Sequence, residues 1–165
     1  MWSSSRRLLL ALVALGGATL AGCGFQLRQP ARVSFGSIAL VGFARHSQLA
    51  EELRRQLTLQ VRVMESPDKV DVVLQALDDV REKSVVASTS AALVRELQLR
   101  LKFNVRARTP GGRELIPRAE LLVKRDLSYS ETAALAKEHE EAELFREMQS
   151  DVVAQVLRRL AAVTV

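Results

Sequence analysis

Apolar and polar residues alternate strictly from residue 97 to residue 108, and this is the strongest pattern in the chain. The apolar positions are Leu97, Leu99, Leu101, Phe103, Val105 and Ala107. Such alternation predicts a half-buried strand with one apolar and one basic face. A turn follows at residues 109–113, which contain Pro110 and two glycines, and a second alternating segment begins at Leu115. We therefore expect a β-hairpin.

The register of this hairpin can be argued from parity, because opposite residues of an antiparallel pair share a face. Pairing Leu101 with Leu121 brings the leucines of both strands together. The charged neighbours that this register creates are Lys102 with Glu120 and Arg108 with Glu114. Pro117 has no backbone N–H and requires an edge strand or a bulge, which would shift the pairing locally.

Two other segments have a helical period. Leu49, Leu53 and Leu57 recur on one helix face, Ser47 is placed to cap that helix, and we expect it to end near Leu59. Residues 128–131 resemble a capping box before a long C-terminal helix. The apolar column of that helix is Leu144, Met148, Val152, Val156 and Leu160. Its polar stretch at residues 137–143 indicates either a solvated first part or a break.

Two further strands are expected. Residues 37–43 form a short apolar run, and a strand begins at Val70, where Asp78 and Asp79 interrupt the alternation and indicate a bulge or a flexible edge. We interpret residues 84–92 as strand ends around a connection. The order β-α-β-β-β-α predicts an α+β fold, a four-stranded mixed sheet with two helices packed on one face, as a single domain at residues 35–165.

The N-terminal segment has the features of an export signal. Arg6 and Arg7 precede a short apolar run, which is typical of a secretory signal peptide at residues 1–22. Residues 20–23, Leu-Ala-Gly-Cys, match the bacterial lipobox, at which Cys23 is acylated and becomes the first residue. Cys23 is the only cysteine, so no internal disulfide can form. We expect a lipidated tether at residues 23–34 and a permanent membrane anchor, and Gly24 favours the outer membrane.

Composition narrows the range of chemistry. Aromatic residues are 4% of the chain, so the core must be aliphatic, and the net charge of +5 becomes +3 once Arg6 and Arg7 leave with the signal. That excess permits an anionic ligand but does not indicate nucleic acid. The two histidines, His46 and His139, have no metal-binding spacing, and no nucleophile motif is present. We expect no enzyme activity, no metal and no cofactor.

The basic residues of the hairpin have two interpretations. In the register that pairs Leu101 with Leu121, six basic residues share one sheet face; they are Arg100, Lys102, Arg106, Arg108, Arg118 and Lys124. That face is either a solvated surface interleaved with carboxylates or a surface for anionic groups such as phosphates, which Arg and Lys bind by charge-assisted hydrogen bonds.

Residues 22–28, Gly-Cys-Gly-Phe-Gln-Leu-Arg, resemble the N-terminal signature of the LptE family of lipopolysaccharide-assembly lipoproteins. Residues 134–137, Ala-Leu-Ala-Lys, and blocks at 146–148 and 155–160 are similar to that family's C-terminal helix, and residues 96–99 resemble one of its strand starts.

The resemblance implies an outer-membrane plug that sits on the periplasmic side or in the lumen of the β-barrel LptD and binds lipopolysaccharide during its insertion into the outer leaflet. It implicates Lys137 in ligand binding, to which we add Arg100, Lys102 and Arg106 as candidates. The loop at residues 85–90 has no basic residue to match a second family position. Two alternatives remain: a structural lipoprotein attached to peptidoglycan or to another assembly machine, and a lipid-anchored periplasmic hydrolase.

Overall fold

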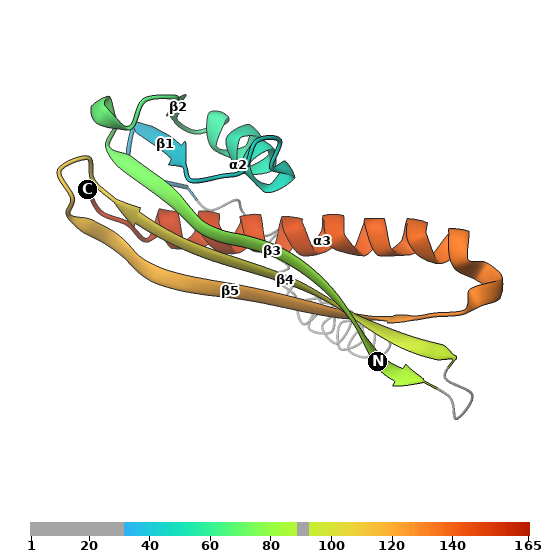
Figure 1. Ribbon diagram of the computed structural model, residues 1–165. Helices are drawn as coiled ribbons and strands as arrows, with labels where there is room; N and C mark the ends of the chain where they lie inside the picture. Colours follow the sequence, from blue (N-terminus) through green and yellow to red (C-terminus); the bar gives the residue numbers. More distant parts are fainter. Residues whose placement is uncertain (1–31, 89–92) are drawn as a thin grey trace, which may run out of the picture. The chain divides into compact units, whose positions relative to one another are not determined.

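The computed structural model describes residues 32–88 and 93–165, so the predicted signal peptide and Cys23 lie outside the described residues. The described chain forms a mixed sheet with strand order β2-β1-β3-β4-β5 (Figure 1). The strands are β1 (Ser37–Val41), β2 (Arg62–Met64), β3 (Val72–Ser88), β4 (Val94–Arg108) and β5 (Glu114–Ser128). β1 is parallel to both neighbours, and β3, β4 and β5 form a long antiparallel meander.

The predicted α+β class is confirmed, but the sheet has five strands where the pattern predicts four. The additional strand is β2, whose three residues pair with the first three of β1. A strand this short shows no period-two alternation, and it follows closely on a helix. The residues after the expected helix end near Leu59 therefore give no strand signal beyond the β-branched Val61 and Val63.

Two helices, α2 (Gln48–Thr58) and α3 (Ala134–Ala161), share one apolar core with the same face of the sheet. The prediction for α2 is confirmed: the Ser47 hydroxyl accepts a hydrogen bond from the Ala50 N–H at 3.2 Å, and the three leucines are buried. The prediction of a capping box at residues 128–131 is wrong, because a 3-10 turn at Glu131–Ala133 precedes α3 and neither element has a side-chain cap.

The burial of α3 changes along its length. Its predicted apolar column is buried from Met148 onward, where Met148, Val152, Val156 and Leu160 are at most 1% exposed. Toward the N-terminus the helix is polar, and Leu135 is 77% exposed. Residues 137–143 are therefore a solvated part of one continuous helix. Within the described residues, no helix is long and apolar enough to cross a membrane.

The parity of the β4–β5 hairpin is confirmed, and its offset is corrected. Leu101 lies opposite Val123, two residues beyond its predicted partner, and Lys102 lies opposite Leu122 instead of Glu120. Because the shift is an even number, the apolar residues at odd positions still face the core from Leu97 to Val105 and from Ala119 to Leu127, and Leu101 is 1% exposed. Nearer the turn Ala107 lies opposite Ile116, which is buried in place of the predicted Leu115.

The correction arises around Pro117. The register shifts twice between Val105 and Arg108 of β4, and each shift gives β5 one additional residue. Pro117 lies within the shift between Ala119 and Ile116, on an edge strand, as its missing N–H requires. At the turn itself Arg108 pairs with Glu114, as predicted.

A bulge in β3 inverts the faces of that strand. The register with β4 shifts between Ala76 and Asp78, leaving Leu77 as the additional residue. Before the shift the even-numbered residues face the helix side of the sheet, and from Asp79 to Val85 the odd-numbered ones do; the register shifts again between Val85 and Ala87 and between Ala87 and Ser88. Gly42, with φ of 79°, lies against the bulge, and a Cβ atom there would come within 2.3 Å of the Ala76 carbonyl oxygen. The bulge therefore requires glycine at this position.

Candidate functional site

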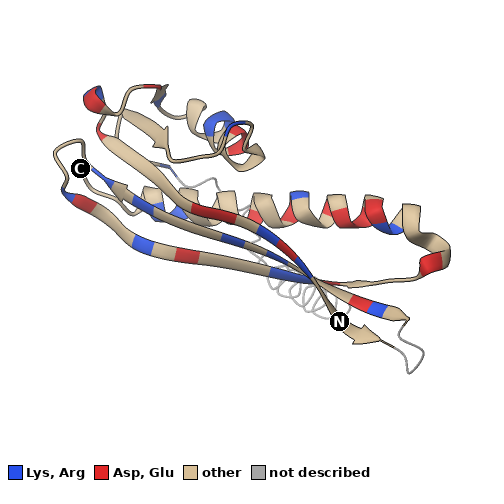
Figure 2. Cartoon of the chain, in the orientation of Figure 1, with Lys and Arg blue, Asp and Glu red and all other residues tan. Residues whose placement is uncertain are grey.

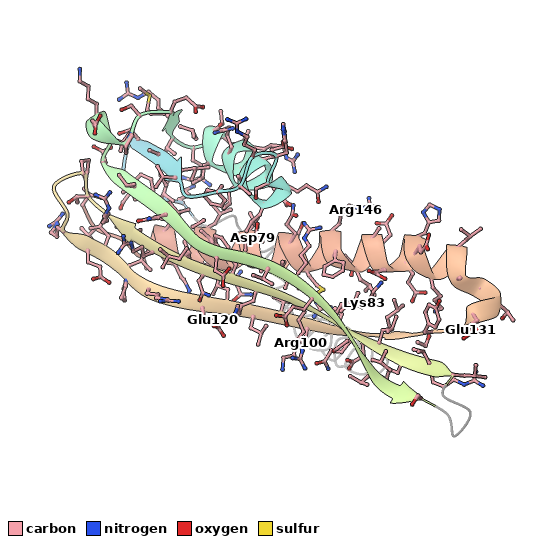
Figure 3. All side chains as sticks on the ribbon, viewed as in Figure 1. Asp79, Lys83, Arg100, Glu120, Glu131 and Arg146 are labelled. Carbon is pink, nitrogen blue, oxygen red and sulfur yellow. The ribbon has the colours of Figure 1, made fainter. Side chains whose placement is uncertain are left out.

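The candidate residues on β4 lie in a row on the sheet face that points away from the helices. Arg100, Lys102 and Arg106 are on the opposite side of β4 from the buried Leu99, Leu101 and Phe103. Figure 3 shows Arg100 projecting away from α3. Across the strands, Arg100 lies between Glu82 of β3 and Lys124 of β5.

This outer face carries both signs of charge. Lys102 lies 3.6 Å from Asp78, which also accepts a hydrogen bond from the Asn104 amide at 3.4 Å. Arg100 donates to Gln98, and Arg106 donates to Gln75 of β3. Figure 2 shows acidic and basic residues interleaved along the three long strands. The structure therefore brings three candidate residues together, but on a mixed surface rather than on a basic patch.

The fourth candidate, Lys137, lies apart from this row. Its Nζ donates to the Ser128 hydroxyl at 3.1 Å and to Glu140 at 2.7 Å, and its side chain is 19% exposed. Ser128 is four residues along β5 from Lys124, the partner of Arg100, which is about 13 Å at ~3.3 Å per residue. The four candidates therefore form two separate positions.

A polar groove between β3 and α3 has no counterpart in the sequence prediction. It has a volume of about 370 Å³. It is lined by Gln48, Arg81, Lys83, Glu138, Glu141, Ala142, Phe145 and Arg146. Lys83 projects toward α3 in Figure 3 and binds Glu141 at 2.9 Å. The β3 bulge creates this groove, because it turns Arg81 and Lys83 toward the helix.

Arg81 joins three elements at one end of the groove. Its guanidinium donates to Gln48 of α2 at 3.1 Å and to Gln149 of α3 at 2.8 Å, and it stacks 5.5 Å from the ring centroid of Phe145. Gln149 is 6% exposed and donates in turn to Glu52 of α2 at 2.8 Å. This network fixes the middle of α3 over the sheet. The signal that could have found it is the charged run Arg81-Glu82-Lys83 directly after an interrupted strand.

A second polar link lies at the other end of β3. Asp71 accepts hydrogen bonds from the Ser37 hydroxyl at 2.9 Å and from the N–H groups of Ser37 and Gly36. These bonds, the hydroxyl's first, hold the pKa of the Asp71 carboxyl below its usual range. The link ties the start of β1 to the start of β3.

In residues 32–88 and 93–165, no group of three or more His, Cys, Asp or Glu side chains is placed to hold a metal ion. The absence of enzyme activity stays a prediction.

The family model and the similar proteins that match this chain carry the same description. Residues 35–160 match the family model described as LptE, lipopolysaccharide-assembly. The chain is 27% identical over 161 residues to the LPS-assembly lipoprotein LptE of Yersinia enterocolitica, and 28% identical to that of Yersinia pestis; each alignment covers 95% of this chain and 77% of the relative.

Solved structures share the fold. A solution NMR structure of an uncharacterized lipoprotein B from Nitrosomonas europaea has a TM-score of 0.73 at 27% identity, covering 84% of this chain and 91% of that one. The rare lipoprotein B from Shewanella oneidensis has a TM-score of 0.66 at 23% identity, covering 77% of this chain and 95% of that one, and supports the fold alone.

Proposed function

The chain belongs to the LptE family of lipopolysaccharide-assembly lipoproteins, and from this premise we propose that it is the lipid-anchored plug subunit of the lipopolysaccharide translocon in the outer membrane. In this role it pairs with the β-barrel LptD and binds lipopolysaccharide while the barrel inserts it into the outer leaflet. Acylated Cys23 holds the mature chain at the membrane.

The observation that carries the plug role is the open, charge-interleaved outer face of the long meander (Figure 2). β4 and β5 each have 15 residues, which corresponds to about 50 Å of polar sheet surface at ~3.3 Å per residue. Large barrels have polar, hydrated interiors. A sheet that is apolar on its helix side and polar outside suits such a lumen, because neither surface loses favourable solvation there.

The ligand role rests on the two basic positions. Arg100, Lys102 and Arg106 offer N–H donors along one face of β4, and Lys137 offers a single ammonium at the start of α3. Lipopolysaccharide phosphates accept charge-assisted hydrogen bonds from such groups. Since each cation already has a polar neighbour, the phosphate must displace a local contact, and we expect moderate affinity that falls with salt.

The decisive experiment is purification of the tagged full-length lipoprotein from outer membranes, followed by identification of the co-purifying proteins. The proposal expects a β-barrel in stoichiometric amount and reduced surface lipopolysaccharide in depleted cells. Recovery of peptidoglycan or of a different assembly machine would favour the structural-lipoprotein alternative. Normal lipopolysaccharide export in depleted cells would remove the proposed function.

The site assignment needs its own test. The charge-reversed variants Lys137→Glu and Arg100→Glu/Arg106→Glu should each bind lipopolysaccharide more weakly than the wild type, and more weakly still when combined. Arg55→Glu is a matched control that makes the same charge reversal at an exposed residue of α2. Unchanged binding in all the reversed variants would remove the site assignment and leave the plug role intact.

A further inference from the structure

Four separate segments of the chain meet at one end of the domain. The Val33 N–H donates a hydrogen bond to the Gln60 side chain at 3.2 Å, and the Ser34 hydroxyl donates to the Val163 carbonyl at 2.6 Å. β1 and β3 begin side by side, and β4 ends opposite the start of β3, so the β4–β5 turn lies at this end too (Figure 1). We call this end the tether end and define it by residues 32–36, 59–62, 108–113 and 162–165.

The tether end is rich in arginine. Its four segments contain four arginines and no Asp or Glu, and two more arginines lie in the last turn of α3, close to residue 162. The six residues are Arg32, Arg62, Arg108, Arg113, Arg158 and Arg159. The described residues form six ion pairs, and none of these pairs involves an arginine of this set. Clustered cations of this kind favour an anionic partner.

Two carboxylates border the tether end without neutralising it. Asp71 is held by hydrogen bonds from the start of β1, close to Arg62. Glu114 lies opposite Arg108 at the start of β5. Because six arginines face these two carboxylates, the surface keeps an excess of positive charge.

Exposed apolar side chains accompany the arginines. Leu59, directly after α2, is 78% exposed, which is the largest exposed fraction of any large apolar side chain in the described residues, and Val165 is 51% exposed. Cations beside an exposed leucine are a combination that binds a lipid interface. The cations attract anionic headgroups, and the apolar side chain enters the boundary between headgroups and acyl chains.

The tether brings a lipid surface to this end of the domain. Arg32 lies nine residues after Cys23, and nine residues span at most about 32 Å when fully extended. An acylated Cys23 therefore keeps the tether end within reach of the bilayer that holds the acyl chains. Because the anchor makes contact with headgroups an intramolecular event, even weak contacts act at a high effective concentration.

We propose that the tether end binds the anionic phospholipid surface of the leaflet that holds the acyl chains of Cys23. This inference rests on the lipid anchor of the proposed function and goes beyond it by assigning the face of the domain that meets the membrane. The arginines bind headgroup phosphates, and Leu59 enters the headgroup layer. In the translocon, the tether end then lies at the periplasmic mouth of the barrel, level with the surrounding headgroups.

The first test places a fluorophore on the full-length acylated lipoprotein in vesicles. Gly111→Cys carries an environment-sensitive label on the β4–β5 turn, where the nearest non-neighbouring atom would lie 3.9 Å from the added Cβ, and Leu135→Cys carries it at the far end of α3. Fluorescence from position 111 should rise at least twofold in vesicles that contain phosphatidylglycerol relative to vesicles of phosphatidylcholine alone. The rise should disappear in high salt, and position 135 should not respond. Equal responses at both positions, or in both kinds of vesicle, would overturn the proposal.

Charge reversal distinguishes this surface from a general effect of net charge. In the labelled protein, Arg32→Glu/Arg113→Glu should lower the response of position 111 to the level seen in phosphatidylcholine. Arg45→Glu/Arg95→Glu is the matched control, because it makes the same change of charge at two exposed arginines that also lack an ion pair within the described residues. An unchanged response in the first variant, or equal losses in both, would contradict the assigned surface.

Photo-crosslinking in isolated outer membranes identifies what covers the tether end. A photoreactive group on Gly111→Cys should form adducts with phospholipid while the full-length lipoprotein is bound to its partner. Adducts with the barrel or with lipopolysaccharide in place of phospholipid would overturn the proposal by identifying another occupant. Recovery of a chain with an unmodified Cys23 would instead remove the anchor, and with it the part of the proposed function on which this inference rests.

Discussion

The two halves of α3 are held to the sheet by different means. Residues 148–161, the packed half, bury four large apolar side chains almost completely against β4, β5 and α2. Residues 134–147, the polar half, are largely exposed and reach the sheet through three contacts: the Lys83–Glu141 ion pair, the hydrogen bond from Lys137 to Ser128, and Arg81 over Phe145. One continuous helix therefore has an end fixed by buried area and an end fixed by a few polar contacts.

The packed half therefore contributes most to the stability of the fold, whereas the polar half can change its conformation more easily. Buried apolar area is non-directional and sets the free energy of unfolding of the whole domain. Exposed ion pairs contribute little, so the polar half should open locally at a lower free energy than the packed half. The groove lies beside the polar half, where a bound molecule can change the local structure at small cost.

The largest effect should come from a charge placed in the packed region. Phe103→Asp puts a carboxylate at a fully buried position of β4 whose neighbours across the strands are Asp79 and Leu121, so that no cation lies opposite it. An unpaired buried charge of this kind should cost more than about 4 kcal/mol and abolish folding. Circular dichroism and urea titration would show the loss. A stably folded variant would mean that the faces of β4 are misassigned.

Truncation should distinguish the two halves directly. Leu160→Ala removes a fully buried side chain of the packed half and should lower the free energy of unfolding by about 2–5 kcal/mol. Leu135→Ala makes the same chemical change in the polar half, where the side chain is 77% exposed, and should change it by under about 0.5 kcal/mol. Similar losses in urea denaturation would contradict the comparison.

Removing Arg81 should loosen the middle of α3. Arg81→Ala deletes the hydrogen bonds to Gln48 and Gln149 and the contact with Phe145, and should cost about 1–2 kcal/mol. Amide exchange should accelerate in residues 134–150 and not in the last two turns of the helix. The exposed Arg118→Ala on β5 is the control, and acceleration along the whole of α3 would show that the halves are not independent.

The link between Asp71 and the start of β1 should show a smaller effect on stability, and this effect should depend on pH. The folded-state pKa of Asp71 is depressed, so its contribution to stability is present above the unfolded-state pKa and is lost as pH falls through the folded-state value. Asp71→Asn should therefore be less stable than the wild type at neutral pH, and the difference should shrink in acid. Thermal unfolding measured from pH 7 to pH 2 would reveal this; a constant difference would argue against the link.

The smallest effect is expected on the outer sheet face. Lys102→Ala removes a partly exposed ion pair in which the nitrogen lies 3.6 Å from the Asp78 carboxylate. The free energy of unfolding should change by under about 1 kcal/mol. A larger loss in chemical denaturation would indicate that the outer face contributes to the fold as well as to contacts with other molecules.

Much of the fold was accessible from periodicity. The leucines of α2, the buried column of α3 and the inward residues of β4 each repeat over enough residues to define a face. β2 was not accessible, because three residues show no period. The pairing offset around Pro117 was not accessible either, because it depends on two register shifts in the folded sheet, while parity alone determines only which face a residue takes.

The candidate site was accessible only as single residues. The sequence places Arg100, Lys102 and Arg106 on one face because they alternate with leucines, and the structure agrees. It does not reveal that Asp78 lies beside Lys102, or that Lys137 occupies a separate position, since both depend on contacts between distant segments. The groove was missed for the same reason: Arg81 and Lys83 face α3 only because of the bulge before them.

The bulge at Leu77 acts as a one-residue phase switch for β3 as far as Val85. If Leu77 were drawn into regular pairing, with no change of sequence, the two sides of this segment would be exchanged, so that Glu82 would point at α3 and Arg81 at the outer face. The groove would lose both of its strand-borne cations in a single step. Gly42, which leaves space for the bulge, therefore decides which chemistry each surface of β3 presents, although it contributes no side chain to either.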